Sequence, residues 1–437
     1  MTGSVPHRGT IEDSNPPTTT SSSALSSFPA EPSPAPAPYI VLLSSSATAQ
    51  EIQSVNSTLV NEAAPNSLSE TVSNTTGLVV FFKAGINPSQ ADSIRKAPGV
   101  DGVFLDETLE KEQLQSSKRA PLSSASLHPR DHTIRLQSDA VDELKVISQP
   151  VGANLAALPG YGYAHEAGRG VTIYVVDTGV YSMNSEWSDM PGTKDIIYLP
   201  GAAKNEKDFL NHGTCVASKA GGPVYGTAKD ANMVVVKLPR FIYTSDLLKA
   251  LREIKDDVIT KDLQGKAVVN FSHGHLDLEY LYSEYEREIN ALIAQDVVIV
   301  AASGNNAKKD DDVNTYPALF GETKDIIVVG AVDDAGHRAP FSQGTGSQLT
   351  VSAPGYVDCA NGREHPNTLH RRGTSFAAPT VAGVIAVWLS QEEHKATLQV
   401  KGQVAARVKK MVQDLAYSRV EGGPPVIWNG IDPRGLS

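Results

Sequence analysis

The second part of the chain, from about residue 141, contains short continuous apolar runs separated by loops and helix-like stretches. These runs are rich in Val and Ile, and they lie at residues 171–176, 233–237, 267–271, 297–302 and 326–332. A continuous apolar run, unlike an alternating one, is typical of a strand that is covered on both faces. The pattern therefore predicts an α/β fold, with a parallel sheet and helices on both of its faces.

Residues 38–109 follow a different pattern, in which shorter strands and helices are mixed. Apolar runs at 39–43, at 78–83 and around 103–105 predict three strands. The polar stretch after the first run is mildly helical, and residues 88–97 also have a helical pattern. This segment is therefore predicted to form a small α+β domain.

The remaining segments are polar and contain few apolar residues. Residues 1–37 are rich in Ser, Thr, Pro and Ala, so they bury too little apolar surface to offset the entropy of ordering. Residues 110–140 are polar and contain Lys118-Arg119, which predicts an exposed linker. We therefore divide the chain into a disordered leader (1–37), a small domain (38–109), a linker with a processing site (110–140) and a main domain (141–437).

Charge and hydropathy exclude two classes of partner. The chain has 38 Lys and Arg against 49 Asp and Glu, a formal net charge of −11, whereas nucleic-acid binding requires an excess of basic residues. The longest apolar candidate, 376–389, contains Pro379 and Gly383 and is shorter than a membrane span. The first 23 residues lack the apolar core of a conventional signal peptide. Either the protein remains inside the cell or its true N-terminus lies upstream, so the compartment stays open.

Two cysteines, Cys215 and Cys359, are too few for a disulfide scaffold. One bridge is compatible with this count. The interpretation that we favour from the sequence is two buried thiols.

Four reactive polar residues stand next to predicted strands or helices. Asp177 ends an apolar run, Asn305 follows another, His212 precedes a stretch of small residues, and Ser375 begins an apolar helix. Each has an ordinary structural interpretation, since Asp and Asn favour turns and Ser favours helix N-caps. The combination of all four in one chain indicates catalytic chemistry.

The segments around these residues resemble the signature motifs of the subtilisin-like proteases, and more narrowly of the proteinase K-like members. The segments are VVDTG at 175–179, HGT at 212–214, SGN at 303–305 and GTSFAAP at 373–379, and the resemblance extends over about residues 145–395. It implies a serine endopeptidase in which Ser375 is the nucleophile, His212 the general base and Asp177 the residue that orients it. Asn305 would stabilise the oxyanion.

The resemblance also implies a propeptide, a substrate pocket and partners. Residues 38–109 are similar to the family's inhibitory propeptide, which the enzyme would remove by cutting itself between about residues 110 and 140. Ser272-His273-Gly274 and Ala302-Ser303-Gly304 match the walls of the primary pocket, which would accept a large apolar side chain. The partners implied are protein or peptide substrates and the chain's own propeptide, and we expect a monomer.

The sequence departs from the family pattern at several positions. His273 replaces the usual Leu, Cys215 replaces a second His, and Ser218 stands where Gly is usual. The segment 239–243 replaces a Gly-Ser-Gly edge strand.

No cofactor is expected for the chemistry, but the resemblance suggests one structural metal site. Asp333, with the carbonyls of Pro317 and Leu319, occupies the position of a structural calcium site in proteinase K-like members. Two rival functions were weighed. A catalytically dead binding protein would be favoured by a missing triad residue, and an acidic peptidase of the sedolisin type would lack the motif around His212.

Overall fold

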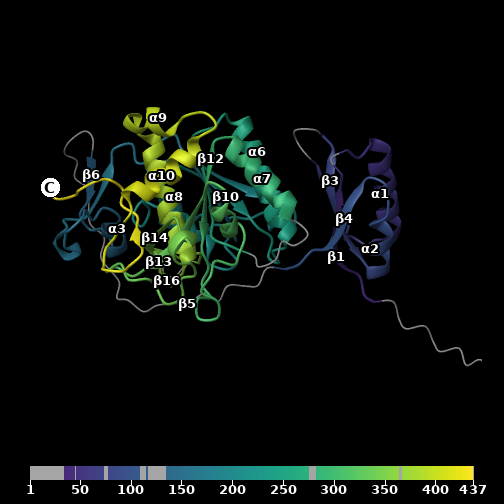
Figure 1. Cartoon of the computed structure of the whole chain (residues 1–437), viewed down its shortest axis with the longest axis horizontal. Coiled ribbons are helices and arrows are strands. Elements are labelled where there is room, and N and C mark those ends of the chain that lie inside the picture. The colour runs from purple at the N-terminus through teal and green to yellow at the C-terminus, as the bar shows by residue number, and fades with distance from the viewer. Residues whose placement is uncertain are drawn as a thin grey trace, which may run out of the picture. The chain divides into compact units, whose positions relative to one another are not determined.

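The computed structural model describes residues 34–44, 46–72, 77–108, 134–274, 282–363 and 367–436, together with the backbone of 115–116. The chain divides into the units Met1–Ala35 and Pro36–Ser437, and everything below concerns the second unit. Most of the predicted leader and of the predicted linker, including Lys118-Arg119, lies outside the described residues. Figure 1 shows the labelled elements.

The first sheet is antiparallel and has four strands in the order β2–β3–β1–β4. Its strands are β1 (Ala37–Leu43), β2 (Ser69–Val72), β3 (Val79–Ile86) and β4 (Val100–Leu105). Two helices, α1 (Ala49–Glu62) and α2 (Pro88–Ile94), pack on one face of this sheet. Both helices begin with a capping box, in which the N-cap side chain and the third helical residue satisfy each other's backbone donors.

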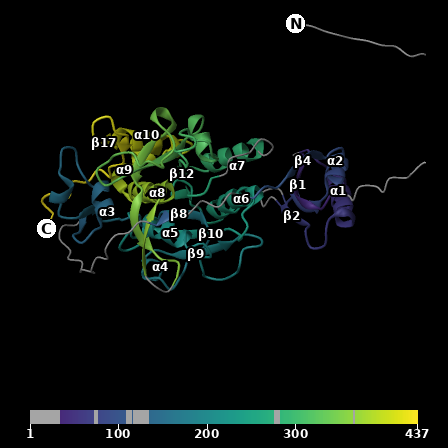
Figure 2. The ribbon, with the colours of Figure 1, turned by 90° about the horizontal axis from the view of Figure 1, so that it is seen from below.

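The main sheet has nine strands in the order β17–β18–β14–β13–β12–β11–β8–β10–β9, and only the β17–β18 pair is antiparallel. Figure 2 shows β8, β9 and β10 together. This mostly parallel sheet confirms the predicted α/β fold. The strands are β8 (Thr172–Asp177), β9 (Lys194–Tyr198), β10 (Asn232–Lys237), β11 (Ala267–Phe271), β12 (Val297–Ala302), β13 (Ile326–Val332), β14 (Val351–Pro354), β17 (Tyr417–Ser418) and β18 (Pro425–Val426).

Helices cover both faces of the main sheet because its strands are apolar on both sides. In β8, Ile173 and Val175 belong to one core, and Tyr174 and Val176 belong to the other. The first core is completed by α5 (Gly213–Gly221), α8 (Thr374–Ser390) and α10 (Val404–Leu415). The second is completed by α6 (Thr244–Thr260) and α7 (Tyr282–Ala294).

Shorter elements connect these layers. They are the strands β5 (Gln115–Ser116), β6 (Ile134–Gln137), β7 (Tyr161–Ala164), β15 (Tyr356–Ala360) and β16 (Thr368–Arg372), the helices α3 (Asp142–Ile147), α4 (Ser185–Ser188) and α9 (Glu392–Leu398), and three 3₁₀ turns at Leu155–Ala157, Ala318–Glu322 and Gly346–Gln348. Strands β15, β16 and β5 form a three-stranded sheet, and β6 pairs with β7. None of the helices in the described part of the chain is long and apolar enough to span a membrane.

The strand order of the main sheet changes direction at β8. The chain leaves β8 toward β9 and β10 on one side, and it later returns to β11 on the other side. In open α/β sheets, ligands bind at the carboxyl ends of the strands where such a change occurs. The carboxyl ends of β8 and β11 are Asp177 and Phe271, so this is where a site is expected.

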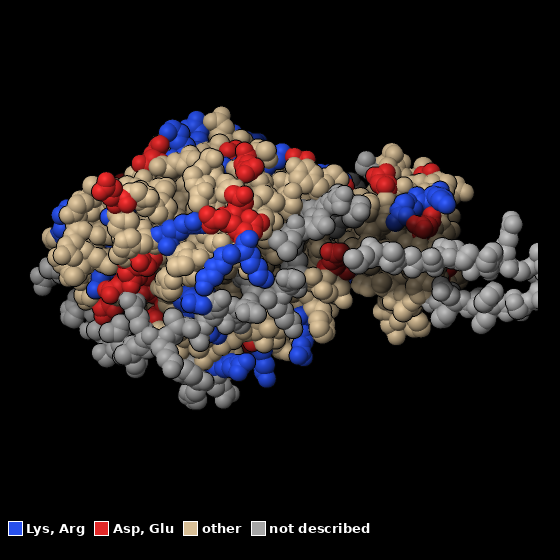
Figure 3. All heavy atoms as spheres, turned by 60° about the horizontal axis from the view of Figure 1, so that its bottom comes forward, with Lys and Arg blue, Asp and Glu red and all other residues tan. Residues whose placement is uncertain are grey.

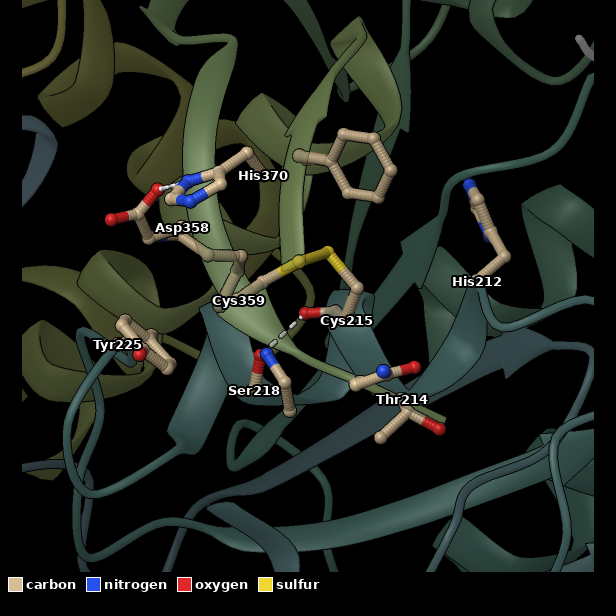
Figure 4. Close-up of a disulfide and its surroundings, with 12 residues drawn as sticks. His212, Thr214, Cys215, Ser218, Tyr225, Asp358, Cys359 and His370 are labelled. Carbon is tan, nitrogen blue, oxygen red and sulfur yellow. Dashed lines mark hydrogen bonds and ion pairs between the residues drawn. A yellow bond between two sulfur atoms is a disulfide. The ribbon is translucent and has the colours of Figure 1, made fainter. Parts of the chain in front are cut away.

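The expectation of two buried thiols is wrong, because Cys215 and Cys359 form a disulfide with an S–S distance of 1.96 Å (Figure 4). Both residues are fully buried, and their Cα atoms are 4.9 Å apart because the first turn of α5 packs against β15. Ser218 links the same elements, since its Oγ donates to the Cys215 carbonyl (2.8 Å) and accepts from the Ala360 N–H (3.0 Å).

Candidate active site

Asp177 and His212 form a buried pair at the carboxyl end of β8. His212 Nδ1 lies 2.9 Å from both carboxylate oxygens of Asp177. Asp177 is fully buried, and His212 is 2% exposed. The pair therefore has the geometry of a carboxylate that fixes the orientation of an imidazole ring.

The pKa of Asp177 is lowered although the residue is buried. Burial alone would raise the pKa, because it disfavours the charged form. The imidazoles of His212 and His273 outweigh this effect, so the pKa of Asp177 falls well below its ordinary value. The carboxylate is thus ionised throughout the neutral range.

Asp208 joins the loop after β8 to the start of α5. Its carboxylate accepts hydrogen bonds from the Thr178 hydroxyl (2.6 Å) and from both the N–H and the hydroxyl of Thr214 (2.8 Å each). Thr178 in turn donates its N–H to Asp177 (2.7 Å). One buried carboxylate therefore fixes the two segments that carry Asp177 and His212. Sequence reasoning missed Asp208, whose only sequence signal is its place four residues before the histidine motif.

Two glycines allow these segments to approach each other. A Cβ atom on Gly213 would lie 2.2 Å from the Gly179 carbonyl oxygen and 3.0 Å from the Asp177 Cβ. Gly179 itself has a φ of +115°, which side chains other than glycine rarely adopt. The close packing of the two loops therefore requires glycine at both Gly179 and Gly213.

Ser375 lies in the first turn of α8. Its hydroxyl donates to the Ser272 carbonyl at 3.0 Å, and the Ser272 hydroxyl donates to the Ser375 carbonyl at 2.7 Å. The next residue, Phe376, contacts the imidazole of His212, with ring centroids 5.3 Å apart. The structure thus brings the start of α8, the end of β11 and the Asp177–His212 pair into one site.

Asn305 is held against the same loop through its side-chain oxygen. Asn305 Oδ1 accepts from the Thr374 N–H (2.9 Å) and from the Thr374 hydroxyl (3.2 Å). A Cβ atom on Gly373 would lie 3.5 Å from Asn305 Nδ2 and 3.6 Å from Oδ1, so the whole amide group lies close to the backbone just before Ser375. An amide donor next to the serine is what an oxyanion site requires.

The residues predicted to line the primary pocket follow two adjacent strands. Ser272, His273 and Gly274 come directly after β11, and Ala302–Gly304 end and follow β12, which pairs with β11 in parallel register. Ser303 is buried and donates to the Gln343 carbonyl (2.7 Å), whereas Gly274 is exposed. The two segments therefore lie at the same edge of the sheet as Asp177.

The replacement of Leu by His273 places a second imidazole beside Asp177. His273 Nε2 lies 3.3 Å from Asp177 Oδ1, and the rings of His212 and His273 are 4.8 Å apart. Sequence analysis assigned His273 only to the pocket wall. Asp177 lies 96 positions before His273 in the sequence, so no local pattern could indicate their contact.

The segment 239–243 does not form a strand of its own. It follows β10, exposes the Phe241 side chain (62%), and pairs only through the isolated bridge between Tyr243 and Thr108. Among the described residues, this segment therefore contributes no strand at the position where the family has an edge strand.

The proposed calcium ligands have other partners in the structure. The Asp333 carboxylate accepts from the N–H groups of Ala335 (3.0 Å) and His337 (2.9 Å) in the turn after β13. The Pro317 carbonyl accepts from the Phe320 N–H (3.1 Å). A calcium site formed by Asp333, Pro317 and Leu319 remains a prediction.

On the face of the molecule shown in Figure 3, basic and acidic side chains lie side by side. The basic residues do not form one continuous surface there.

Comparisons with known proteins agree with this fold. The sequence profile of the Subtilase family matches residues 168–421. Subtilisin-like protease 3 of Pseudogymnoascus destructans is 34% identical over 279 residues, which cover 60% of this chain and 65% of that protein. Alkaline protease 1 of Emericella nidulans is 28% identical over 345 residues, which cover 78% of this chain and 79% of that protein.

A solved structure is also similar, that of a cold adapted subtilisin-like serine proteinase. It aligns with a TM-score of 0.53 at 25% identity and covers 66% of this chain and 98% of the other. Because the family profile covers more than half of the sequence, the chain belongs to the subtilase family of serine endopeptidases. This confirms the family that the four motifs predicted.

Proposed function

We propose that this chain hydrolyses peptide bonds through an acyl-enzyme formed on Ser375. His212 removes the proton of the Ser375 hydroxyl and later donates it to the leaving amine. Asp177 fixes the tautomer of the imidazole and stabilises its cation. The observation that carries the proposal is the buried Asp177–His212 pair at the switch point of the sheet, beside the start of α8.

In the proposed mechanism, the charge that develops on the carbonyl oxygen is stabilised by two donors. One is Asn305 Nδ2, whose orientation is supported by the hydrogen bonds of Oδ1 to Thr374. The other is the backbone N–H of Ser375 in the first turn of α8, where the helix dipole favours negative charge. Donors that are fixed before the reaction stabilise the transition state without reorganisation.

The substrate proposed is a protein or peptide with a large apolar side chain before the cleaved bond. The pocket walls after β11 and β12 are formed by small residues and one imidazole, and they carry no carboxylate that would select a basic side chain. The substrate backbone would pair with Ser272–Gly274. The segment 239–243 offers at most a short edge for residues further upstream.

Residues 38–109 are proposed to be the inhibitory propeptide. One face of their sheet, with Ile40, Leu42 and Phe81, belongs to the same core as α6 and α7. Asp106 is buried and accepts from the N–H (3.1 Å) and the hydroxyl (2.7 Å) of Ser245, in the first turn of α6. A carboxylate at this position caps the helix and interacts favourably with its dipole.

Backbone pairs also join the chain after this domain to two parts of the main domain. Thr108 bridges to Tyr243, and Gln115 and Ser116 pair with Arg372 and Arg371, just before the Ser375 loop. We propose that Ser375 cuts its own chain between about residues 110 and 140, because a cut within one molecule benefits from a high effective concentration.

Hydrolysis of peptide substrates by the wild-type chain and by Ser375→Ala tests the proposed reaction. The substrates carry either Phe or Lys before the scissile bond. We expect the wild-type protein to cleave the Phe substrate faster, and Ser375→Ala to lose about 10⁶ in kcat, the size of effect measured for the nucleophile of subtilisin. Turnover by Ser375→Ala at a rate near that of the wild type would refute the role of Ser375.

A further inference from the structure

His273 has an unusual environment. Its imidazole is 12% exposed and lies above the fully buried Asp177. Its Nε2 is buried and lies 3.3 Å from Asp177 Oδ1, in an ion pair that lacks good hydrogen-bond geometry. A buried nitrogen without a well-aligned hydrogen bond remains able to bind a ligand.

His273, Asp177 and His212 together offer three donors of the types that bind transition metals. One ligand atom from each residue lies within 4.8 Å of the other two, and no other group of three His, Cys, Asp or Glu among the described residues has this property. Zn²⁺ binds imidazole nitrogen and carboxylate oxygen at about 2.0–2.2 Å, so tetrahedral donors are separated by roughly 3.4 Å. The separations of 2.9 Å and 3.3 Å from Asp177 are close to this value.

We propose that Asp177, His212 and His273 form a binding site for Zn²⁺ that switches the enzyme off reversibly. The ion would bind one oxygen of Asp177, His273 Nε2 and His212 Nδ1, with water as the fourth ligand. The proton on His212 Nδ1 would be released to solvent. The ion can approach from the side of His273, the most exposed of the three residues.

Zn²⁺ at this position would prevent catalysis for two reasons. It would replace the Asp177–His212 hydrogen bond that orients the imidazole. It would also place a positive charge next to a ring that must accept a proton from Ser375, which lowers the basicity of that ring. Inhibition should therefore reduce kcat and be reversed by a chelator. The inhibition by Zn²⁺ should depend on His273, because a Leu at this position would provide no ligand.

Zn²⁺ titration of peptide hydrolysis tests the inhibition. The wild-type protein, His273→Leu and the control His394→Leu are compared, each relative to its own metal-free rate, with EDTA added at the end. His394 lies on α9, 28% exposed and remote in sequence from the site. We expect the half-inhibitory Zn²⁺ concentration to rise at least about tenfold in His273→Leu and to stay unchanged in His394→Leu. Equal sensitivity of all three proteins would overturn the proposal. Should His273→Leu fold poorly, His273→Phe keeps a ring at this position and provides the same comparison.

Metal binding is measured separately, so that the result does not depend on the proposed function. Calorimetry with Zn²⁺ uses the full-length Ser375→Ala chain, which retains all three ligands, and the double variant Ser375→Ala/His273→Leu. We expect one Zn²⁺ per chain in the first protein and at least about tenfold weaker binding in the second. Binding that His273→Leu leaves unchanged, or no binding in either protein, would overturn the metal site. Zn²⁺ binding by a chain that hydrolyses no peptide would refute the proposed function alone.

Discussion

At the scale of single residues, the feature that governs the proposed chemistry is the ionised carboxylate of Asp177. Burial raises its pKa, but the adjacent imidazoles of His212 and His273 lower the pKa by more. The pKa is therefore depressed in the folded state, so the interaction contributes stability above the unfolded value of about 4. That contribution is lost only as the pH falls below 4 toward the folded pKa.

This charge state predicts how activity depends on pH. Asp177 stays ionised from pH 5 upward, so the step in activity is set by the imidazole of His212, which must be neutral to act as a base. We expect kcat/KM to rise with pH through one step between about 6 and 8. The profile is measured with a small peptide substrate in metal-free buffer. An optimum at pH 3 to 4 would instead indicate an acidic peptidase.

The sequence predicts the principal residues of the proposed site because each occurs in a local motif. Asp177, His212 and Ser375 could be named from short segments, and the structure brings those segments together. The contact of His273 with Asp177 and the central position of Asp208 could not be predicted. Both depend on residues from separate segments meeting at the carboxyl end of β8, which no local pattern records.

At the scale of elements, α5 carries His212 at its N-terminus and is tied to β15 by the Cys215–Cys359 disulfide. The two cysteines are 144 residues apart in sequence, and bridges that close long loops remove the most entropy from the unfolded chain. The pairing could not be deduced from two cysteines alone. It follows from the packing of α5 against the β15–β16 hairpin.

Removal of this bridge should destabilise the main domain. The double variant Cys215→Ala/Cys359→Ala is expected to lose about 2–5 kcal/mol of the free energy of unfolding. Denaturant unfolding is followed in the Ser375→Ala background, where self-digestion is suppressed. Reductant should lower the stability of the parent protein and leave the double variant unaffected. An identical unfolding midpoint for the parent with and without reductant would contradict the disulfide.

Apolar runs predict the buried strands well, because a strand that is covered on both faces requires apolar side chains on both sides. Strands β11, β12 and β13 have the bounds that their runs predict. The short strands β2 and β16 were not predicted, since partly exposed strands of four or five residues lack such a run. Helix α1 is largely polar, and its sequence gave only a weak helical pattern; its capping box and the buried Val55 and Leu59 stabilise it.

At the scale of the whole molecule, changes in composition mark the segments of the chain but not the contacts between them. The polar stretch after residue 109 separates two regions of apolar pattern. The burial of Asp106 against Ser245 could not be foreseen, because it joins residues 139 positions apart. These contacts support the proposal that the first region is a propeptide.

Self-processing gives this proposal a direct test. We expect the wild-type chain to mature by a cut between about residues 110 and 140, which N-terminal sequencing locates. Ser375→Ala, produced alone, should remain at full length, because its tail meets no nucleophile. Wild-type enzyme added in trans is the control for accessibility of the tail. Normal maturation of Ser375→Ala in a host without other processing proteases would point to cleavage in trans, for example after Lys118-Arg119.

The most direct test of the central claim, that Ser375 is an activated nucleophile, is the intact mass of the purified protein after reaction with a fluorophosphonate probe. We predict one adduct per mature chain, mapped to Ser375 by peptide sequencing. No adduct is predicted in Ser375→Ala, and labelling of His212→Ala should be strongly slowed, because the base that activates the hydroxyl is missing. A folded wild-type chain that takes up no probe, or takes it up equally after Ser375→Ala, would contradict the claim.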